Sequence, residues 1–204
     1  DATIRSLLCH TAGIADGEDG FYGLRRNDPP VTLLDILEGR TTYNNRPARA
    51  EKPQGTAFEY SDAGYCILQL LVEEVAGQAF EDVARTLIFD PLGVEHTFFA
   101  SPRNVEAFAQ TGSMAAGYDG DGLPLSGKSP IVPDLAASAL WSTPKDLLTV
   151  ARAFLSAMKG ESTFLSAASA REMATPVEKF PWMGLGLFMA GENVLMSQGW
   201  GENG

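Results

Sequence analysis

The triplet Tyr60-Ser61-Asp62 is the part of the sequence best suited to proton-transfer chemistry. A tyrosine phenol can relay a proton to a leaving group when cationic neighbours lower its pKa. A structural interpretation is also open, in which Tyr60 is a half-buried tyrosine and Asp62 is the N-cap of the helix that follows. The triplet alone therefore fits both a catalytic and a structural role.

The other residues that could do chemistry argue against a metal centre. His10 and His96 are the only histidines, which speaks against a zinc site and against a histidine-based triad. The turn around Asp119 and Asp121 has a faint likeness to a calcium loop, but it lacks the later Glu ligand and fits a solvated turn better. We predict no metal and no cofactor.

The composition is that of a globular protein without nucleic-acid affinity. The formal charge is −11, and the 15 Lys and Arg are scattered, so the chain should repel nucleic acid. No run approaches the ~18 apolar residues of a membrane span. The two cysteines, Cys9 and Cys66, lie in segments expected to be helical. We expect both to be reduced and mostly buried thiols.

Capping signals predict the helix that would hold the triplet. Asp62 is a suitable N-cap, and Gly77 supplies a left-handed end after an apolar pattern with a 3.6-residue period. Similar signals predict helices over 3–13, 32–39, 80–91 and 143–160. The last of these carries a predicted buried stripe formed by Leu147, Val150, Ala151, Phe154 and Met158.

Strand signals come late in the chain. Residues 185–189 and 193–196 flank a Gly-containing turn and predict a hairpin, whereas 14–31, 40–58 and 101–134 are rich in loop-forming residues. A lone two-stranded hairpin is marginal in water. We therefore predict an α+β fold, mostly a helical lobe with the start of an antiparallel sheet from about residue 184, as one partial domain over 1–204 that is incomplete at both ends.

Four ordered segments of the sequence resemble the family of class C β-lactamases, D-amino-acid-specific peptidases and related esterases. The first, Thr3 through Ile14, is similar to that family's "TIRHLLSHTSGL" stretch. The others are Pro53 through Leu71, which contains the triplet; Pro91-Leu92-Gly93-Val94 together with Ala139-Leu140-Trp141-Ser142-Thr143; and Gly184-Leu185-Gly186-Leu187 followed by 197–204. The resemblance implies a β-lactamase/transpeptidase-like fold and an acyl-serine mechanism.

The resemblance assigns roles to individual residues. Tyr60 matches the tyrosine that shares proton transfer with a lysine, and Asp62 stands where the family usually has Asn, so we assign both as catalytic. A carboxylate there can only accept hydrogen bonds and would raise the pKa of a nearby lysine. His10 corresponds to a structural histidine that bonds backbone near the active site.

The family's Ser-x-x-Lys motif should precede Thr3, outside this chain. Two similar patterns begin at Ser142 and Ser156, but the first straddles a helix start and the second lies at a helix C-terminus, where the partial charge is negative. We assign neither serine as the nucleophile.

Gln198 and Trp200 align with the family's third motif, His-x-Gly or Lys-Thr-Gly, and we assign both to substrate binding. Gln198 cannot carry the charge with which a lysine holds a substrate carboxylate, although it can bond an amide or a hydroxyl. The backbone N–H of Trp200 could complete an oxyanion hole. Two alternatives stay open: a one-residue shift that places Gly201 in the motif, and a simple surface turn over 198–204.

Two functions are consistent with the matches and departures between this sequence and the motifs of the resembled family. The first is part of an acyl-serine hydrolase acting on an ester, a D-amino-acid peptide or a β-lactam, inactive as this chain alone, with a small molecule or short peptide as its partner. The second is a catalytically dead relative that binds peptidoglycan fragments or a protein. The resemblance is also compatible with an extracytoplasmic bacterial location.

Overall fold

A computed structural model describes residues 2–16, 30–41, 46–112, 114–125, 127–129, 131–191 and 194–197. The helical elements are α1 (Ile4–Leu8), α2 (Leu33–Leu37), α3 (Asp62–Ala76), α4 (Phe80–Ala84), the π-helical turn η1 (Arg85–Phe89), α5 (Asp90–Leu92), α6 (Val105–Gln110), α7 (Leu135–Ser138), α8 (Pro144–Lys159) and α9 (Ala167–Met173). The strands are β1 (Ile14–Ala15), β2 (Arg49–Ala50), β3 (Phe98–Phe99), β4 (Leu140–Trp141), β5 (Phe188–Met189) and β6 (Leu195–Met196).

Short antiparallel strand pairs connect segments that lie far apart in the chain. β1 pairs with β2 and β3 pairs with β4, while β5 and β6 form the hairpin predicted near the C-terminal end. The hairpin is shorter than predicted, because its register pairs only Phe188 with Met196 and Met189 with Leu195. The first two pairs were missed, since two-residue strands inside loop-rich segments leave no alternating pattern to detect.

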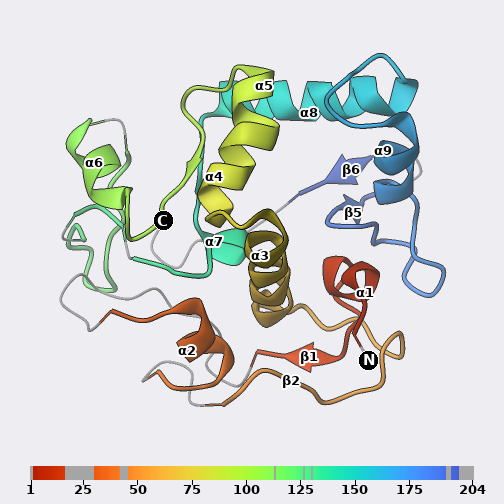
Figure 1. Cartoon of the computed structure of the whole chain (residues 1–204), viewed down its shortest axis with the longest axis horizontal. Helices are drawn as coiled ribbons and strands as arrows, with labels where there is room; N and C mark the ends of the chain where they lie inside the picture. Colours follow the sequence, from red (N-terminus) through yellow and green to blue (C-terminus); the bar gives the residue numbers. More distant parts are fainter. Residues whose placement is uncertain are drawn as a thin grey trace.

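Helix α3 occupies the centre of the molecule and contacts α1, α2, α4 and α7 (Figure 1). Its core-facing residues include Ala63 and Cys66, which are fully buried. The predicted end at Gly77 is confirmed, with a left-handed φ of 62°. The predicted N-cap was wrong by one residue: Ser61 is the extended cap, and Asp62 is already the first helical residue. Both cysteines are free and buried, as expected.

Helix α1 ends earlier than its glycine signal indicated. Its last residue is Leu8, and His10 rather than Gly13 is the first residue beyond it with a positive φ, 54°. Gly13 is nevertheless required where it is, because a Cβ there would lie 2.2 Å from the backbone oxygen of Lys52. The close approach lets the N–H of Glu51 donate to the Gly13 carbonyl at 2.8 Å, beside the β1–β2 pair.

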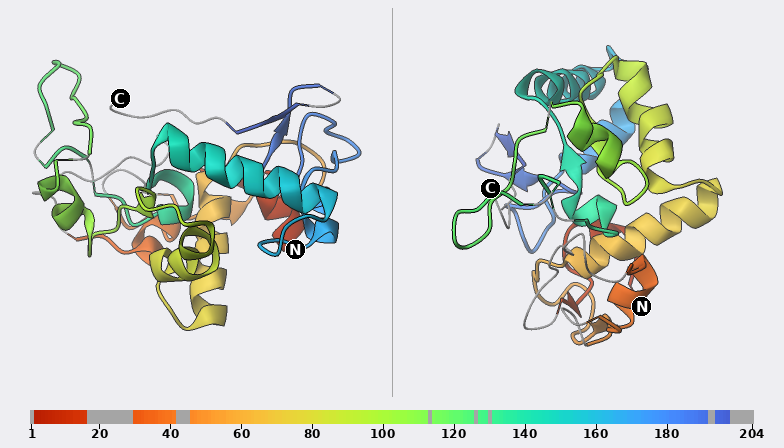
Figure 2. Two further views of the ribbon diagram at one scale, coloured as in Figure 1. Left: turned by 90° about the horizontal axis from the view of Figure 1, so that it is seen from above. Right: turned by 90° about the vertical axis from the view of Figure 1, so that its left-hand side faces the viewer.

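Helix α8 has the predicted boundaries but not the predicted burial. Thr143 caps it, Pro144 begins it, and Gly160 closes it with a φ of 79°. The expected buried stripe was wrong in part, since Leu147 is 50% exposed and Ala151 is also exposed. The helix runs along one edge of the molecule, where it contacts α5 and α9 (Figure 1, Figure 2). Among the described helices, none combines the length and apolarity needed to cross a membrane.

Candidate active site

Tyr60 is presented at the surface immediately before the central helix. Its side chain is 53% exposed, and its hydroxyl interacts electrostatically with the carboxylate of Asp62. One face of its ring stacks on the His10 imidazole, with 4.4 Å between ring centroids and 26° between planes. The stacking thus fixes the ring plane of an accessible phenol that lies near a carboxylate.

His10 is a buried structural partner of this tyrosine. The residue is 5% exposed, and its ring also stacks on Tyr65 at 5.1 Å and meets the edge of Phe58 at 5.8 Å. Its Nδ1 accepts the backbone N–H of Ser61 at 3.1 Å, which leaves the hydrogen of the neutral ring on Nε2. Burial lowers the His10 pKa to about 4, so the ring is uncharged at neutral pH.

Asp16 joins the site from the segment after β1, and the sequence interpretation missed it. Its Oδ1 accepts the Ser61 hydroxyl at 2.8 Å and the Ala63 N–H at 2.9 Å, while its Oδ2 accepts the Asp62 N–H at 2.7 Å. These contacts span 45 to 47 residues along the chain, so no local spacing could have indicated them.

Asp62 occupies an environment that disfavours its charge. Burial raises its pKa to about 7, and the negative charges of Asp16 and Asp134 add to that rise, whereas the interaction with the Tyr60 hydroxyl opposes it. The surroundings of Tyr60 likewise disfavour the charged form of its side chain. Burial and the charges of Asp62 and Asp16 raise the phenol pKa. The predicted lowering by cationic neighbours was therefore wrong for this chain, because carboxylates face Tyr60.

The Ser-x-x-Lys pattern at Ser142 serves a structural purpose. The Ser142 hydroxyl shares a hydrogen bond with Thr97 at 2.8 Å and contacts the Thr143 carbonyl at 3.3 Å. The buried Asp146 carboxylate accepts from the Thr97 hydroxyl at 3.0 Å and from the His96 N–H at 2.8 Å. This group of hydrogen bonds ties the start of α8 to the 96–97 segment.

The two predicted substrate-binding residues, Gln198 and Trp200, lie outside the described residues. Ser197, the last described residue of that segment, follows directly on β6. Their assignment to substrate binding stays a prediction.

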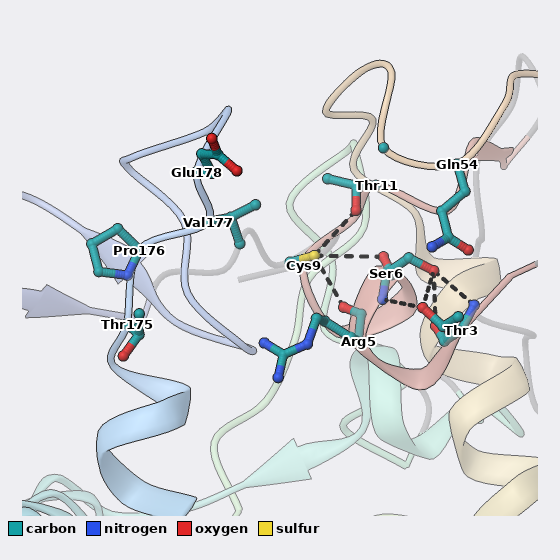
Figure 3. A pocket seen from close by; sticks show the side chains of 11 residues that line it. Thr3, Arg5, Ser6, Cys9, Thr11, Gln54, Thr175, Pro176, Val177 and Glu178 are labelled. Atoms are coloured by element: carbon teal, nitrogen blue, oxygen red, sulfur yellow. Dashed lines mark hydrogen bonds between the residues drawn. The ribbon is translucent and has the colours of Figure 1, made fainter.

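A cavity of about 250 Å³ opens between α1 and the 175–178 segment (Figure 3). Thr3, Ser6, Cys9 and Gln54 line one side of it, and Val177 lies on the other. The Thr3 and Ser6 hydroxyls belong to the capping box of α1. Neither Tyr60 nor Asp62 lines this cavity. Within the described part of the chain, no group of three His, Cys, Asp or Glu side chains could hold a metal ion.

Comparison with known proteins establishes the family. The model of the Beta-lactamase family matches residues 1–204. The chain belongs to the beta-lactamase family. It is 30% identical over 118 residues to the unguisins hydrolase ungD of Aspergillus violaceofuscus, and 27% identical over 134 residues to the putative penicillin-binding protein PbpX of Bacillus subtilis. These alignments cover 58% and 66% of the chain but 19% and 29% of the two relatives.

Solved structures confirm the predicted fold. The D-amino acid amidase from Ochrobactrum anthropi SV3 matches 92% of the chain with a TM-score of 0.67 and 24% identity, and the match covers 54% of that enzyme. The octameric penicillin-binding protein homologue from Pyrococcus abyssi matches 89% with a TM-score of 0.62 and 22% identity, covering 42% of that protein. The chain thus has a β-lactamase/transpeptidase-like α+β fold and spans about half the length of these structures.

Proposed function

We propose that this chain supplies the tyrosine side of an acyl-serine hydrolase site. Membership of a serine hydrolase family makes that reaction class the natural one for the Tyr60 region. The observation that carries the proposal is the state of Tyr60 itself. Its ring is stacked on His10, its hydroxyl interacts with the Asp62 carboxylate, and half of its side chain faces solvent. An ordinary structural tyrosine would not need this combination of restraint and access.

The proposed reaction begins with a serine from a Ser-x-x-Lys segment that precedes Asp1 in a longer protein. As the serine oxygen forms a bond to the substrate carbonyl carbon, its proton moves to the Tyr60 hydroxyl, and the Tyr60 proton moves to the Asp62 carboxylate. When the bond to the leaving oxygen or nitrogen breaks, Asp62 returns its proton to Tyr60 and Tyr60 gives a proton to the leaving atom, which departs as an alcohol or amine and leaves the acyl-serine. Water then attacks the acyl carbon and loses a proton to the same relay. The serine oxygen takes a proton back as the bond to the acyl group breaks and the carboxylic acid leaves. The lysine of that segment shares in holding the serine proton.

Asp62 and its surroundings bear on the substrate class. Asp16 and Asp134 both place negative charge near Asp62, so a substrate anion placed at the head of α3 would be repelled. We therefore propose an ester or a D-amino-acid amide or peptide as substrate in preference to a β-lactam. This choice agrees with the structural similarity to a D-amino acid amidase, although that similarity by itself shows the fold and not the substrate.

The test uses the full-length gene product and this chain alone. The full-length protein should hydrolyse p-nitrophenyl esters and react with a fluorophosphonate probe, and this chain alone should do neither. Tyr60→Phe should lower kcat on the order of 10²-fold, because a general acid–base group typically contributes 10²- to 10⁴-fold. A Tyr60→Phe protein with unchanged kcat would contradict the proposal, and so would activity of this chain that disappears in Ser142→Ala.

A second candidate is a catalytically dead relative that binds peptidoglycan fragments or a protein. The raised pKa of Tyr60 favours it, because a phenol that faces carboxylates gives up its proton less readily. A full-length protein that binds such fragments and resists the fluorophosphonate probe would support this candidate over the hydrolase.

A further inference from the structure

Asp16 binds the segment that follows Tyr60 through several hydrogen bonds, and no sequence signal indicated this contact. Its two carboxylate oxygens accept three hydrogen bonds of 2.7 to 2.9 Å from Ser61, Asp62 and Ala63. Hydrogen bonds from N–H groups to a carboxylate are among the stronger ones in proteins. One side chain from the β1 segment thus fixes three consecutive residues that follow Tyr60.

The same segment completes the hydrogen bonding at the start of α3. The first N–H groups of a helix have no partner within it and need outside acceptors. The N–H of Ser61 donates to His10 Nδ1, those of Asp62 and Ala63 donate to Asp16, and that of Gly64 donates to the Ser61 hydroxyl. Because every N–H from 61 to 64 has an acceptor, the backbone that carries Tyr60 has little freedom to shift.

Asp16 also places a negative charge near the Asp62 carboxylate, which interacts with the Tyr60 hydroxyl. The titratable groups around Asp62 are Asp16 after β1, Asp134 at the N-cap of α7, and Tyr60 and Cys66 on its own segment. The neutral His10 ring lies behind Tyr60. Of the two other carboxylates, Asp16 is the one that also bonds the Asp62 backbone.

We propose that Asp16 is a positioning residue of the active site, which orients Tyr60 through the first turn of α3 and adds a negative charge beside the Asp62 carboxylate. This inference rests on the proposed function, in which Tyr60 passes its proton to Asp62. Asp16 contacts neither the phenol nor the proposed reacting atoms, so its influence is indirect and separable from that of Tyr60.

The test compares Asp16→Asn and Asp16→Ala with the unmodified full-length protein. Asp16→Asn keeps the size and one acceptor oxygen but removes the charge, so it should fold even where Asp16→Ala does not. A displacement of about 1 Å can cost on the order of 10²-fold in rate, and we expect kcat for p-nitrophenyl acetate to fall about 10- to 100-fold with KM changed less. The acid limb of the pH–kcat profile should move to lower pH in Asp16→Asn.

Asp35→Asn is the matched control. Asp35 is also a capping carboxylate that accepts from a backbone N–H, a hydroxyl and an arginine, but it lies on α2 and does not touch the motif. It should leave kcat and the acid limb unchanged. If Asp16→Asn behaves like Asp35→Asn, or lowers kcat without moving the acid limb, Asp16 is merely a structural cap and the inference is overturned.

A second measurement separates this inference from the proposed function. The ¹³C chemical shift of the Asp62 carboxyl reports its protonation without any substrate, and its midpoint should fall in Asp16→Asn. A Tyr60→Phe protein with full activity would contradict the proposed function, but it would leave the expected change of the Asp62 titration midpoint in Asp16→Asn untouched. A midpoint that stays in place in Asp16→Asn would overturn the inference even if Tyr60 proves catalytic.

Discussion

Replacing Asp62 by Asn should make the protein more stable at alkaline pH. Asp62 has a pKa of about 7 in the folded state against an ordinary value of 3.8, mainly because it is buried and secondly because Asp16 is negative. A group whose folded-state pKa is raised stabilises the fold most below its unfolded pKa, and that stabilisation is lost as the pH rises through the folded value. Asp62→Asn resembles the protonated form at every pH.

The pKa difference sets the size of the effect. A rise from 3.8 to about 7, at about 1.4 kcal/mol per pKa unit, corresponds to about 4 kcal/mol at most. At pH 8 the variant should gain up to that amount in free energy of unfolding, and near pH 4 the two proteins should be equally stable. The amide oxygen of Asn can still interact with the Tyr60 hydroxyl.

Urea unfolding followed by tryptophan fluorescence at pH 4.5, 6, 7 and 8 measures this difference. Asp121→Asn is the control, because Asp121 is exposed on a turn and its replacement should not produce a pH-dependent gain. A stability difference for Asp62→Asn that stays constant between pH 4.5 and 8 would show that Asp62 does not titrate in this range, and the electrostatic reasoning would be wrong.

Two further predictions concern buried polar groups. Because burial lowers the His10 pKa from 6.5 to about 4, stability should be lost as the pH falls from 6.5 toward 4, by about 3 kcal/mol at most. His10→Gln should remove this loss in urea unfolding and His96→Gln should not; the opposite pattern would refute the assignment. Gln69→Leu should lower the free energy of unfolding by about 2–4 kcal/mol, because the Pro133 carbonyl and the Ala136 N–H lose their partner. A loss below about 0.5 kcal/mol would contradict this role of Gln69, since surface substitutions typically fall within that range.

Local signals predicted several helix ends correctly, although the end of α1 and the N-cap of α3 were wrong. Thr3, Thr32 and Thr143 all cap helices with their side chains, and Gly77 and Gly160 take the left-handed conformation that ends a helix. Each of these features depends on a few neighbouring residues, so the sequence carries the necessary information. The Tyr60 region could be found for a different reason, because ordered motifs of a known family identify it regardless of its structure.

The features that sequence reasoning missed depend on contacts between distant segments. Asp16 reaches its partners across 45 to 47 residues. The burial of α8 also depends on its neighbours, and Leu147 lies on a predicted core stripe yet is half exposed at the edge of the molecule. A periodic apolar pattern indicates which face of a helix is suited to burial, but not whether another element covers it.

The position of Asp62 inside the first turn of α3, one residue after the N-cap Ser61, bears on the chemistry of the site. An anion is favoured at a helix N-terminus because N–H groups and the helix dipole stabilise it. Two carboxylates meet at the head of α3, and Asp16 takes the N–H groups of Asp62 and Ala63, while the Ser61 hydroxyl takes that of Gly64. Asp62 is thereby displaced from the cap into the helix, where its carboxylate interacts with the Tyr60 hydroxyl and lies near a like charge. Burial raises the pKa of Asp62 most and the charge of Asp16 adds to that rise, so the residue that fixes the Tyr60-Ser61-Asp62 motif also makes Asp62 a more ready proton acceptor.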